Sequence, residues 1–406
     1  MIKKDKQIRK FCYYGFLKDL KFFEPYLILY LMNFGFSLFQ IGLLYTVKEV
    51  IVYFFEIPSG ILADNYGKKK ELQMCFIFYM ISFGLFAIGK YYGVGMLAMV
   101  FFGLGEAFRS GTHKAMIYTY LEQKRWFDHK RYVYGLTRSY SLTGAAISSA
   151  ISIVLAIKLP LQFLFIIGII PYVLDFLLIM SYPDSLDERR HVKFKFRQFV
   201  VDMFEEIADI MRRGPVMRTV TSSAFFDAVF KTVKDYIQPI LKTIFAFSVT
   251  AHIFGLSGEN SLKVVLGLVY GVMYMLGALA SKNGHRLQKY RTSRDFMNDS
   301  FTALGFILLG IGLLMRNEWV WGVILLFLLL YIVENIRRPC FVDVIGDMID
   351  KNERATILSV ESQLKSIFVA VLAPLIGLCA DYFSIDSSLF GLGIVVFVLS
   401  LFIRVK

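Results

Sequence analysis

The sequence predicts an all-α integral membrane protein in which twelve transmembrane helices form two pseudo-symmetric six-helix bundles. Apolar residues make up 56% of the 406 positions, and the mean hydropathy is +0.57. A soluble globule of this composition would expose large apolar surfaces, so a lipid bilayer is the expected solvent. Long apolar stretches recur along the whole chain, and landmarks of the first half reappear in the second half.

Twelve apolar stretches are long enough, at about 20 helical residues, to cross a hydrocarbon core of about 30 Å. These predicted spans lie near residues 11–33, 38–61, 71–90, 93–117, 133–157, 159–181, 216–245, 260–281, 295–315, 317–341, 355–380 and 384–404. The longest connection, residues 182–215, separates an N-terminal bundle over residues 1–181 from a C-terminal bundle over residues 216–406. Its amphipathic pattern from Val192 predicts a helix at the cytoplasmic face or membrane interface, as a spacer or as a regulatory element.

Lysine and arginine residues gather in alternate connections. They cluster in residues 3–10, 68–70, 124–131, 189–213, 282–294, 351–354 and 404–406, whereas the opposite loops hold scattered cations such as Lys90 and Lys158. Because cytoplasmic loops retain positive charge, we expect a multi-pass protein of the cell (plasma) membrane with both termini cytoplasmic. The lysine and arginine clusters in these cytoplasmic connections account for most of the net charge of +13. Because they flank membrane spans and do not form one continuous basic surface, they disfavour nucleic-acid binding.

Other chemistries lack their sequence signatures. The four cysteines stand singly, without a CxxC pair or a histidine at ligand spacing, so we expect neither a metal site nor a cofactor. The chain has no glycine-rich nucleotide loop, no GxSxG elbow and no HExxH motif, which argues against an enzyme. A repeated pore-loop segment, as a channel would need, is also missing.

The two halves carry the same landmarks in the same order. Pro25 corresponds to Pro239, the turn Gly60–Gly67 to the turn Gly277–Gly284, and the pair Glu106 and Arg109 to the pair Glu334 and Arg337. Six spans therefore repeat as six in parallel sense, as expected of two bundles around a central path.

The first of these turns, GILADNYGKKK, has a spaced pattern of glycine, aspartate and basic residues at Gly60, Asp64, Gly67, Lys68 and Lys69. Glycine permits a close helix approach and a tight reversal. With this turn the chain resembles the major facilitator superfamily (MFS) over essentially its full length. The resemblance implies a cytoplasmic latch that holds the outward-facing state, with Asp64 accepting hydrogen bonds from a helix N-terminus. Ser281 replaces the aspartate in the second copy, and a basic loop without a gating role is the alternative.

Ionisable residues inside the predicted spans are the candidate site, because each costs roughly 2.5–3.5 kcal/mol at a helix centre on insertion scales. They concentrate in spans 1, 4, 7 and 10, which line the central cavity in the superfamily that the chain resembles. The candidate substrate-binding and coupling residues are Asp19, Glu106, Arg109, His113, Asp227, Lys231, Glu334 and Arg337. Mutually satisfied structural ion pairs are the alternative interpretation.

These residues predict a secondary active transporter that moves a small organic solute by proton-coupled alternating access, as a symporter or antiporter. In this hypothesis the many cations favour an anionic solute. Glu106 or Glu334 would respond to protons, and Arg109 or Arg337 would hold the polar or anionic part of the solute. The expected partners are a small-molecule solute, protons and the lipid bilayer, and the expected functional unit is a monomer. A proton-coupled multidrug exporter, an uncoupled facilitator and a non-transporting receptor or scaffold with a transporter fold stay open.

Overall fold

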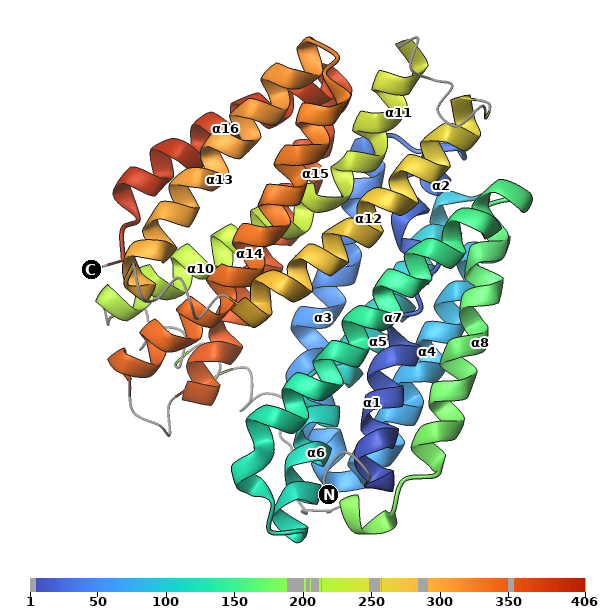
Figure 1. Ribbon diagram of the computed structural model, residues 1–406, viewed down its shortest axis with the longest axis vertical. Coiled ribbons are helices and arrows are strands. Elements are labelled where there is room, and N and C mark those ends of the chain that lie inside the picture. The colour runs from blue at the N-terminus through green and yellow to red at the C-terminus, as the bar shows by residue number, and fades with distance from the viewer. Residues whose placement is uncertain are drawn as a thin grey trace. The chain divides into compact units, whose positions relative to one another are not determined.

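The computed structural model describes residues 5–187, 214–247, 258–283, 291–349 and 354–405, together with positions 201, 205, 212 and 256. Every regular element in these ranges is a helix, which confirms the predicted all-α fold class (Figure 1). Most of the predicted amphipathic helix that begins at Val192, and also Gly284, lie outside the described residues.

The helices follow the order of the predicted spans. In the first half they are α1 (Lys6–Lys18), η2 (Glu24–Tyr26), α2 (Leu27–Met32), α3 (Leu38–Tyr66), α4 (Lys68–Ile88), α5 (Tyr92–Arg109), α6 (Thr112–Gln123), η3 (Phe127–His129), α7 (Lys130–Lys158), α8 (Gln162–Met180) and η4 (Asp184–Leu186). In the second half they are α10 (Gly214–Val233), η5 (Lys234–Tyr236), α11 (Ile237–Phe247), α12 (Gly258–Asn283), α13 (Ser293–Arg316), α14 (Val320–Met348), α15 (Arg354–Tyr382) and α16 (Ile385–Phe402).

Nine helices in the described part of the chain are long and apolar enough to cross a membrane: α3, α4, α7, α8, α12, α13, α14, α15 and α16. The three other predicted spans, which are spans 1, 4 and 7, are each interrupted within their length. The breaks fall between α1 and η2, between α5 and α6, and at η5. Non-helical backbone at membrane depth is tolerated where it is buried in protein or lines a polar cavity.

Local sequence explains two of the breaks. Pro25 stands at the first turn of η2, where its missing N–H is not needed, but it cannot continue the hydrogen-bond ladder of α1. Gly111 separates α5 from α6 with a φ of 75°, a left-handed conformation that favours glycine. Charged residues flank both breaks, with Lys18 and Asp19 at the first and Arg109 at the second.

The chain forms two compact units that do not follow the linear order of the sequence. The first comprises Met1–Phe34, Val47–Phe194 and Lys263–Met275, and the second comprises Gly35–Thr46, Lys195–Leu262 and Leu276–Lys406. Part of each sequence half therefore packs with the other half. The predicted bundle limits, 1–181 and 216–406 with the linker 182–215, stay a prediction.

Each unit includes one short segment from the other half of the sequence, and hydrogen bonds hold that segment in place. In the second unit, the carboxylate of Asp381 accepts the backbone N–H groups of Leu38 at 2.9 Å and Phe39 at 2.7 Å, and so caps the start of α3. In the first unit, the hydroxyl of Tyr26 donates to the carbonyl of Lys263 at 2.8 Å. Lys263 begins the part of α12, Lys263–Met275, that belongs to the first unit.

Helices α1 and α7 approach each other through small residues. A Cβ atom at Gly144 in α7 would lie 2.4 Å from the carbonyl oxygen of Phe16 in α1. A Cβ at Gly15 in α1 would lie 2.8 Å from the carbonyl oxygen of Thr137 in α7. The two backbones are therefore in direct contact, as in other small-residue helix interfaces in membranes. This contact places the end of α1 against one wall of the cavity described below.

Replacing Gly144 by alanine is expected to lower the stability of the protein by about 1–3 kcal/mol, because the added methyl group overpacks the contact with α1. The matched control is Gly135→Ala on the same helix, where a Cβ would meet no described atom within 4 Å. That control should be neutral or stabilising by up to about 1 kcal/mol, since alanine is the better helix former. Thermal unfolding of the purified variants measures both effects, and equal unfolding temperatures would contradict the contact.

Candidate functional site

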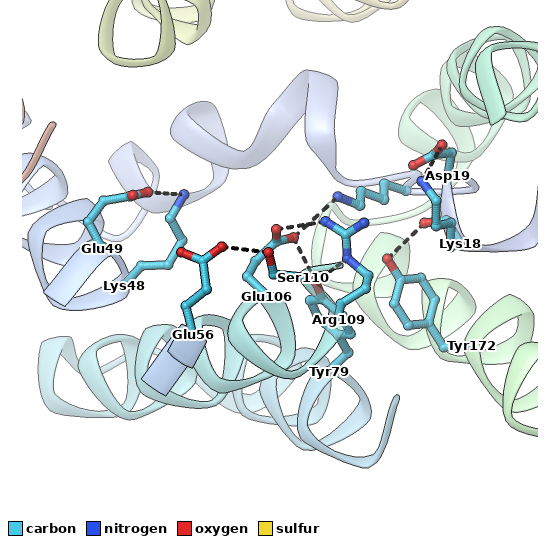
Figure 2. Close-up of polar contacts among 11 residues, drawn as sticks. Lys18, Asp19, Lys48, Glu49, Glu56, Tyr79, Glu106, Arg109, Ser110 and Tyr172 are labelled. Carbon is cyan, nitrogen blue, oxygen red and sulfur yellow. Dashed lines mark hydrogen bonds and ion pairs between the residues drawn. The ribbon is translucent and has the colours of Figure 1, made fainter. Parts of the chain in front are cut away.

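A cluster of ionisable side chains surrounds Glu106 in the first unit, near the break between α5 and α6 (Figure 2). Arg109 donates from Nη2 to Oε2 of Glu106 at 2.8 Å, one helical turn away. The hydroxyl of Tyr79 donates to Oε1 of Glu106 at 2.6 Å and accepts from Nε of Arg109 at 3.2 Å. Lys21 Nζ lies 4.0 Å from the same Oε1. The carboxylate of Glu106 thus faces two cations and one phenol.

A second pair stands at the end of α1. Lys18 Nζ donates to Oδ2 of Asp19 at 2.7 Å, and Asp19 is the residue that ends the helix. The hydroxyl of Tyr172 in α8 donates to the carbonyl oxygen of Lys18 at 2.9 Å, as Figure 2 shows. This bond satisfies a carbonyl that the broken helix leaves without its usual partner. Asp19, a predicted site residue, is therefore held beside a lysine at the helix break.

A cavity of about 330 Å³ opens in the first unit between α1, the α5–α6 segment and α7. Its wall carries one carboxylate, Asp19, and the cationic side chains Lys18, Arg109, Lys114 and Arg138. The opposite charges cancel within the pair Lys18 and Asp19 and within the pair Arg109 and Glu106. The charges of Lys114 and Arg138 therefore remain as an excess of positive charge at the cavity. A cationic concave surface attracts anions.

His113 forms an aromatic part of the cavity wall. Its ring stacks on Tyr14 with a centroid distance of 3.6 Å and an interplanar angle of 10°. Its Nε2 lies 3.3 Å from the hydroxyl oxygen of Tyr182. Phe11 contacts the same imidazole edge-on at 5.4 Å. These contacts fix the orientation of the imidazole, and a role of His113 in proton transfer stays a prediction.

Two ionisable residues of α3 were missed by the sequence reasoning. Lys48 and Glu49 form an ion pair of 3.0 Å, and the Glu49 side chain is fully buried. Further along α3, Glu56 accepts a hydrogen bond of 2.5 Å from Ser110, beside the second helix break (Figure 2). The signal was the adjacent lysine and glutamate inside the apolar stretch of predicted span 2.

The second unit contains its own charged cluster, formed by α10, α14 and α15. Arg338 Nη1 lies 3.1 Å from Asp227 Oδ2 and 2.8 Å from Glu361 Oε1. Glu361 is fully buried and also accepts from the hydroxyl of Ser223 at 3.3 Å. The predicted residue Asp227 is thus paired across helices, with an arginine that the sequence reasoning left out of its site.

Arg337 points into the interior of the second unit and is only 1% exposed. Its Nη2 donates to the carbonyl and hydroxyl oxygens of Ser222, both at 3.1 Å. Its guanidinium lies 4.2 Å from the ring centroid of Phe226 and 3.9 Å from Asp227. Arg337 therefore supports α10 in this conformation and does not line the cavity of the first unit.

Two further predicted residues flank this second cluster. Glu334 lies one turn before Arg337 and Arg338 on α14 and interacts electrostatically with both. Lys231 lies one turn after Asp227 in the last turn of α10. Both side chains are partly buried. The structure places them beside the cluster, and their role in binding or coupling stays a prediction.

The predicted latch turn joins α3 to α4. Gly67 adopts a φ of 106°, and the carboxylate of Asp187, which follows α8, occupies the space that a Cβ at Gly67 would need. Asp187 accepts the backbone N–H of Lys69 at 3.0 Å, and so caps α4 in place of the side chain that glycine lacks. Lys69 Nζ lies 3.0 Å from Asp184. Gly67 and Lys69 thus dock this turn onto the segment of residues 184–187, which follows α8.

The other latch residues lie at the ends of the same helices. Gly60 and Asp64 fall in the last turns of α3, and Lys68 begins α4. A Cβ at Gly60 would meet no atom within 4 Å among the described residues. The gating role of this turn stays a prediction.

A multi-pass helical chain with ion pairs at the breaks of its helices is the architecture of a membrane transporter. Residues 19–294 match the family model of the Major Facilitator Superfamily. This match covers more than half of the chain, and the protein belongs to that superfamily. The family and the fold therefore indicate a membrane transporter of the MFS type and not an enzyme.

Individual relatives agree with the family. An "Uncharacterized MFS-type transporter YxaM" of Bacillus subtilis (strain 168) is 24% identical over 246 residues, which cover 60% of this chain and 60% of that protein. The hexuronate transporter of the same organism is 27% identical over 152 residues, 36% of this chain and 35% of that protein. The matches thus span less than two thirds of both relatives. A solved structure of a nucleoside transporter NupG variant is 12% identical, with a TM-score of 0.79 over 98% of each chain, and it supports the fold.

Proposed function

We propose that this protein is a proton-coupled secondary transporter that moves a small organic anion across the cell membrane by alternating access. The observation that carries the proposal is the cavity of the first unit, whose wall holds one carboxylate against four cationic side chains. A neutral or cationic solute would leave this positive charge uncompensated. An anion would compensate it.

One relative supports the same solute class. The hexuronate transporter of Bacillus subtilis is named for a sugar carboxylate, which is an organic anion of a size suited to a cavity of about 330 Å³. The aromatic side chain of Tyr134 in the cavity wall is 40% exposed and offers a flat apolar surface for a sugar ring or a similar scaffold.

Coupling to protons follows from the contacts of Arg109. Its guanidinium is engaged by Glu106, so a solute carboxylate competes with Glu106 for the same donors. A proton that binds Glu106 removes the negative charge of this competitor and leaves Arg109 available to the anion. The proton and the anion would thus be bound together, as a symporter requires. The broken helix between α5 and α6 would let this event change the path of the chain.

We place the protein in the plasma membrane as a monomer with both termini cytoplasmic, because the cations of the sequence gather in alternate connections. The latch turn at Gly67 would lie on the cytoplasmic side, near the end of α8 to which Asp187 ties it.

A thermal-shift screen of the purified protein tests the solute class. We expect sugar carboxylates to raise the unfolding temperature and the neutral and amino counterparts of the same sugars to leave it unchanged. A ligand that binds only the folded state stabilises by about 2.7 kcal/mol at 100 times its Kd. Replacing Arg138 by glutamine should reduce the shift, whereas the control Lys158→Gln, at the end of the same helix, should keep it. Equal shifts with amino sugars would contradict an anionic solute.

A further inference from the structure

Asp175 is an acidic residue of α8 that the proposed mechanism does not use. Its side chain is 0% exposed, and it lies one turn after Tyr172 on a buried face of an otherwise apolar helix. Neither carboxylate oxygen has a hydrogen-bond partner among the residues that the structure describes. Helix α8 packs against α4 and α1, so this face points into the interior of the first unit.

Burial without partners decides the charge of Asp175. An ionised carboxylate without hydrogen bonds is strongly disfavoured in a protein interior, even after relaxation of the surrounding protein. The protonated acid carries no net charge and has a much smaller cost. The ionisable groups that interact electrostatically with Asp175 include one cation, and they are Tyr14, Lys18, Asp19, Cys75 and Tyr182. Lys18 is already paired with Asp19, so burial without partners favours the neutral carboxylic acid form of Asp175 in this conformation.

Lys18 connects Asp175 to the cavity. Lys18 and Asp19 line the cavity wall, whereas Asp175 is not part of that wall. The carbonyl of Lys18 is tied to Tyr172, one turn before Asp175, so the end of α1 is held against this part of α8. The same lysine therefore interacts with one carboxylate in the cavity wall, Asp19, and with one outside that wall, Asp175.

We propose that Asp175 is a second proton-binding site of this transporter and that Asp175 and Asp19 alternate as the counter-ion of Lys18. In the present state Lys18 pairs with Asp19, and Asp175 holds a proton. In the alternate state a proton leaves the carboxyl group of Asp175 and, through water, binds a carboxylate oxygen of Asp19. Lys18 then pairs with the ionised Asp175, and the total charge of the three groups is unchanged. This inference rests on the proposed proton coupling, to which it adds a path from the cavity to the buried side of α1.

Infrared spectroscopy of the purified protein at neutral pH tests whether Asp175 holds a proton. We expect Asp175→Asn to remove the carbonyl absorption of one protonated carboxylic acid. The control Asp184→Asn, whose side chain is 94% exposed in the same unit, should remove ionised-carboxylate absorption instead. The amide replaces a neutral acid of the same shape, so Asp175→Asn should fold normally. Loss of ionised absorption from Asp175→Asn, or failure of this variant to fold, would overturn the proposal.

A second variant tests the alternation. Asp19→Asn removes the counter-ion of Lys18, so Asp175 is expected to ionise and pair with Lys18. Adding Asp175→Asn to that variant should then remove ionised-carboxylate absorption, and adding Lys18→Met should return Asp175 to its protonated form. If Asp175 keeps its proton in Asp19→Asn, the alternation is wrong. These spectra report protonation without any transported solute, so their outcome is independent of whether the protein moves an anion.

Discussion

Replacing Glu106 by glutamine is expected to reduce proton-driven uptake of the anion to the level of protein-free liposomes while leaving the yield of folded protein unchanged. Glutamine keeps an oxygen that can accept from Tyr79, which donates to Glu106 at 2.6 Å. It neither binds a proton near neutral pH nor balances the charge of Arg109. The variant should therefore still bind the anion, because Arg109 loses its competitor, but it should not respond to a pH gradient.

The matched control for this variant is Glu56→Gln in α3. Glu56 is a second acid beside the same helix break, but its hydrogen bond goes to Ser110 and not to Arg109. A glutamine at this position can still accept from Ser110, so pH-gradient-driven uptake should remain. Uptake is measured in vesicles that hold each purified variant. Undiminished gradient-driven uptake by Glu106→Gln would remove Glu106 from the mechanism.

The second large effect is expected at Glu361. Arg338 Nη1 lies 2.8 Å from Oε1 of Glu361 in the second unit, where the Glu361 side chain is fully buried. Glu361→Gln removes the negative charge of this buried partner of Arg338. Breaking a buried ion pair from one side costs about 3–5 kcal/mol. We therefore expect a large fall in unfolding temperature for the purified variant.

An exposed ion pair with the same nitrogen-to-oxygen distance serves as the control for Glu361. Arg316 Nε and Asp386 Oδ2 are 2.8 Å apart, as are Arg338 Nη1 and Glu361 Oε1, but the Arg316 side chain is 52% exposed. Exposed pairs contribute about 0–1 kcal/mol, so Asp386→Asn should change stability little. Combining Glu361→Gln with Arg338→Met restores the charge balance and should cost less than the sum of the two single changes. Strict additivity would contradict a coupled network.

The membrane architecture could be predicted from the sequence because hydropathy reports burial in lipid directly. Apolar stretches of transmembrane length predicted where the helices lie, and the structure has its helices in the same order along the chain. The breaks in spans 1, 4 and 7 were not predicted, although Pro25 and Gly111 mark two of them. A hydropathy average over about 20 residues does not resolve an interruption of a few residues.

The charged residues of the candidate site could be found, but most of their partners could not. Glu106 and Arg109 lie on one helix, three positions apart, and helix geometry places side chains at that spacing next to each other. Asp227 pairs with Arg338, and Lys18 contacts Tyr172 of α8 through its carbonyl. Those contacts depend on how helices pack, which a single sequence does not encode locally. Asp175 gave the weakest signal, because it stands alone in an apolar span.

The most direct test of the central claim is flux into proteoliposomes that contain only this protein, measured with a sugar carboxylate that stabilises it in the thermal-shift screen. We expect saturable uptake above that of protein-free liposomes, and this uptake should increase when the outside is made more acidic than the inside. Binding of the same carboxylate without any flux would contradict transport and would favour a receptor or scaffold.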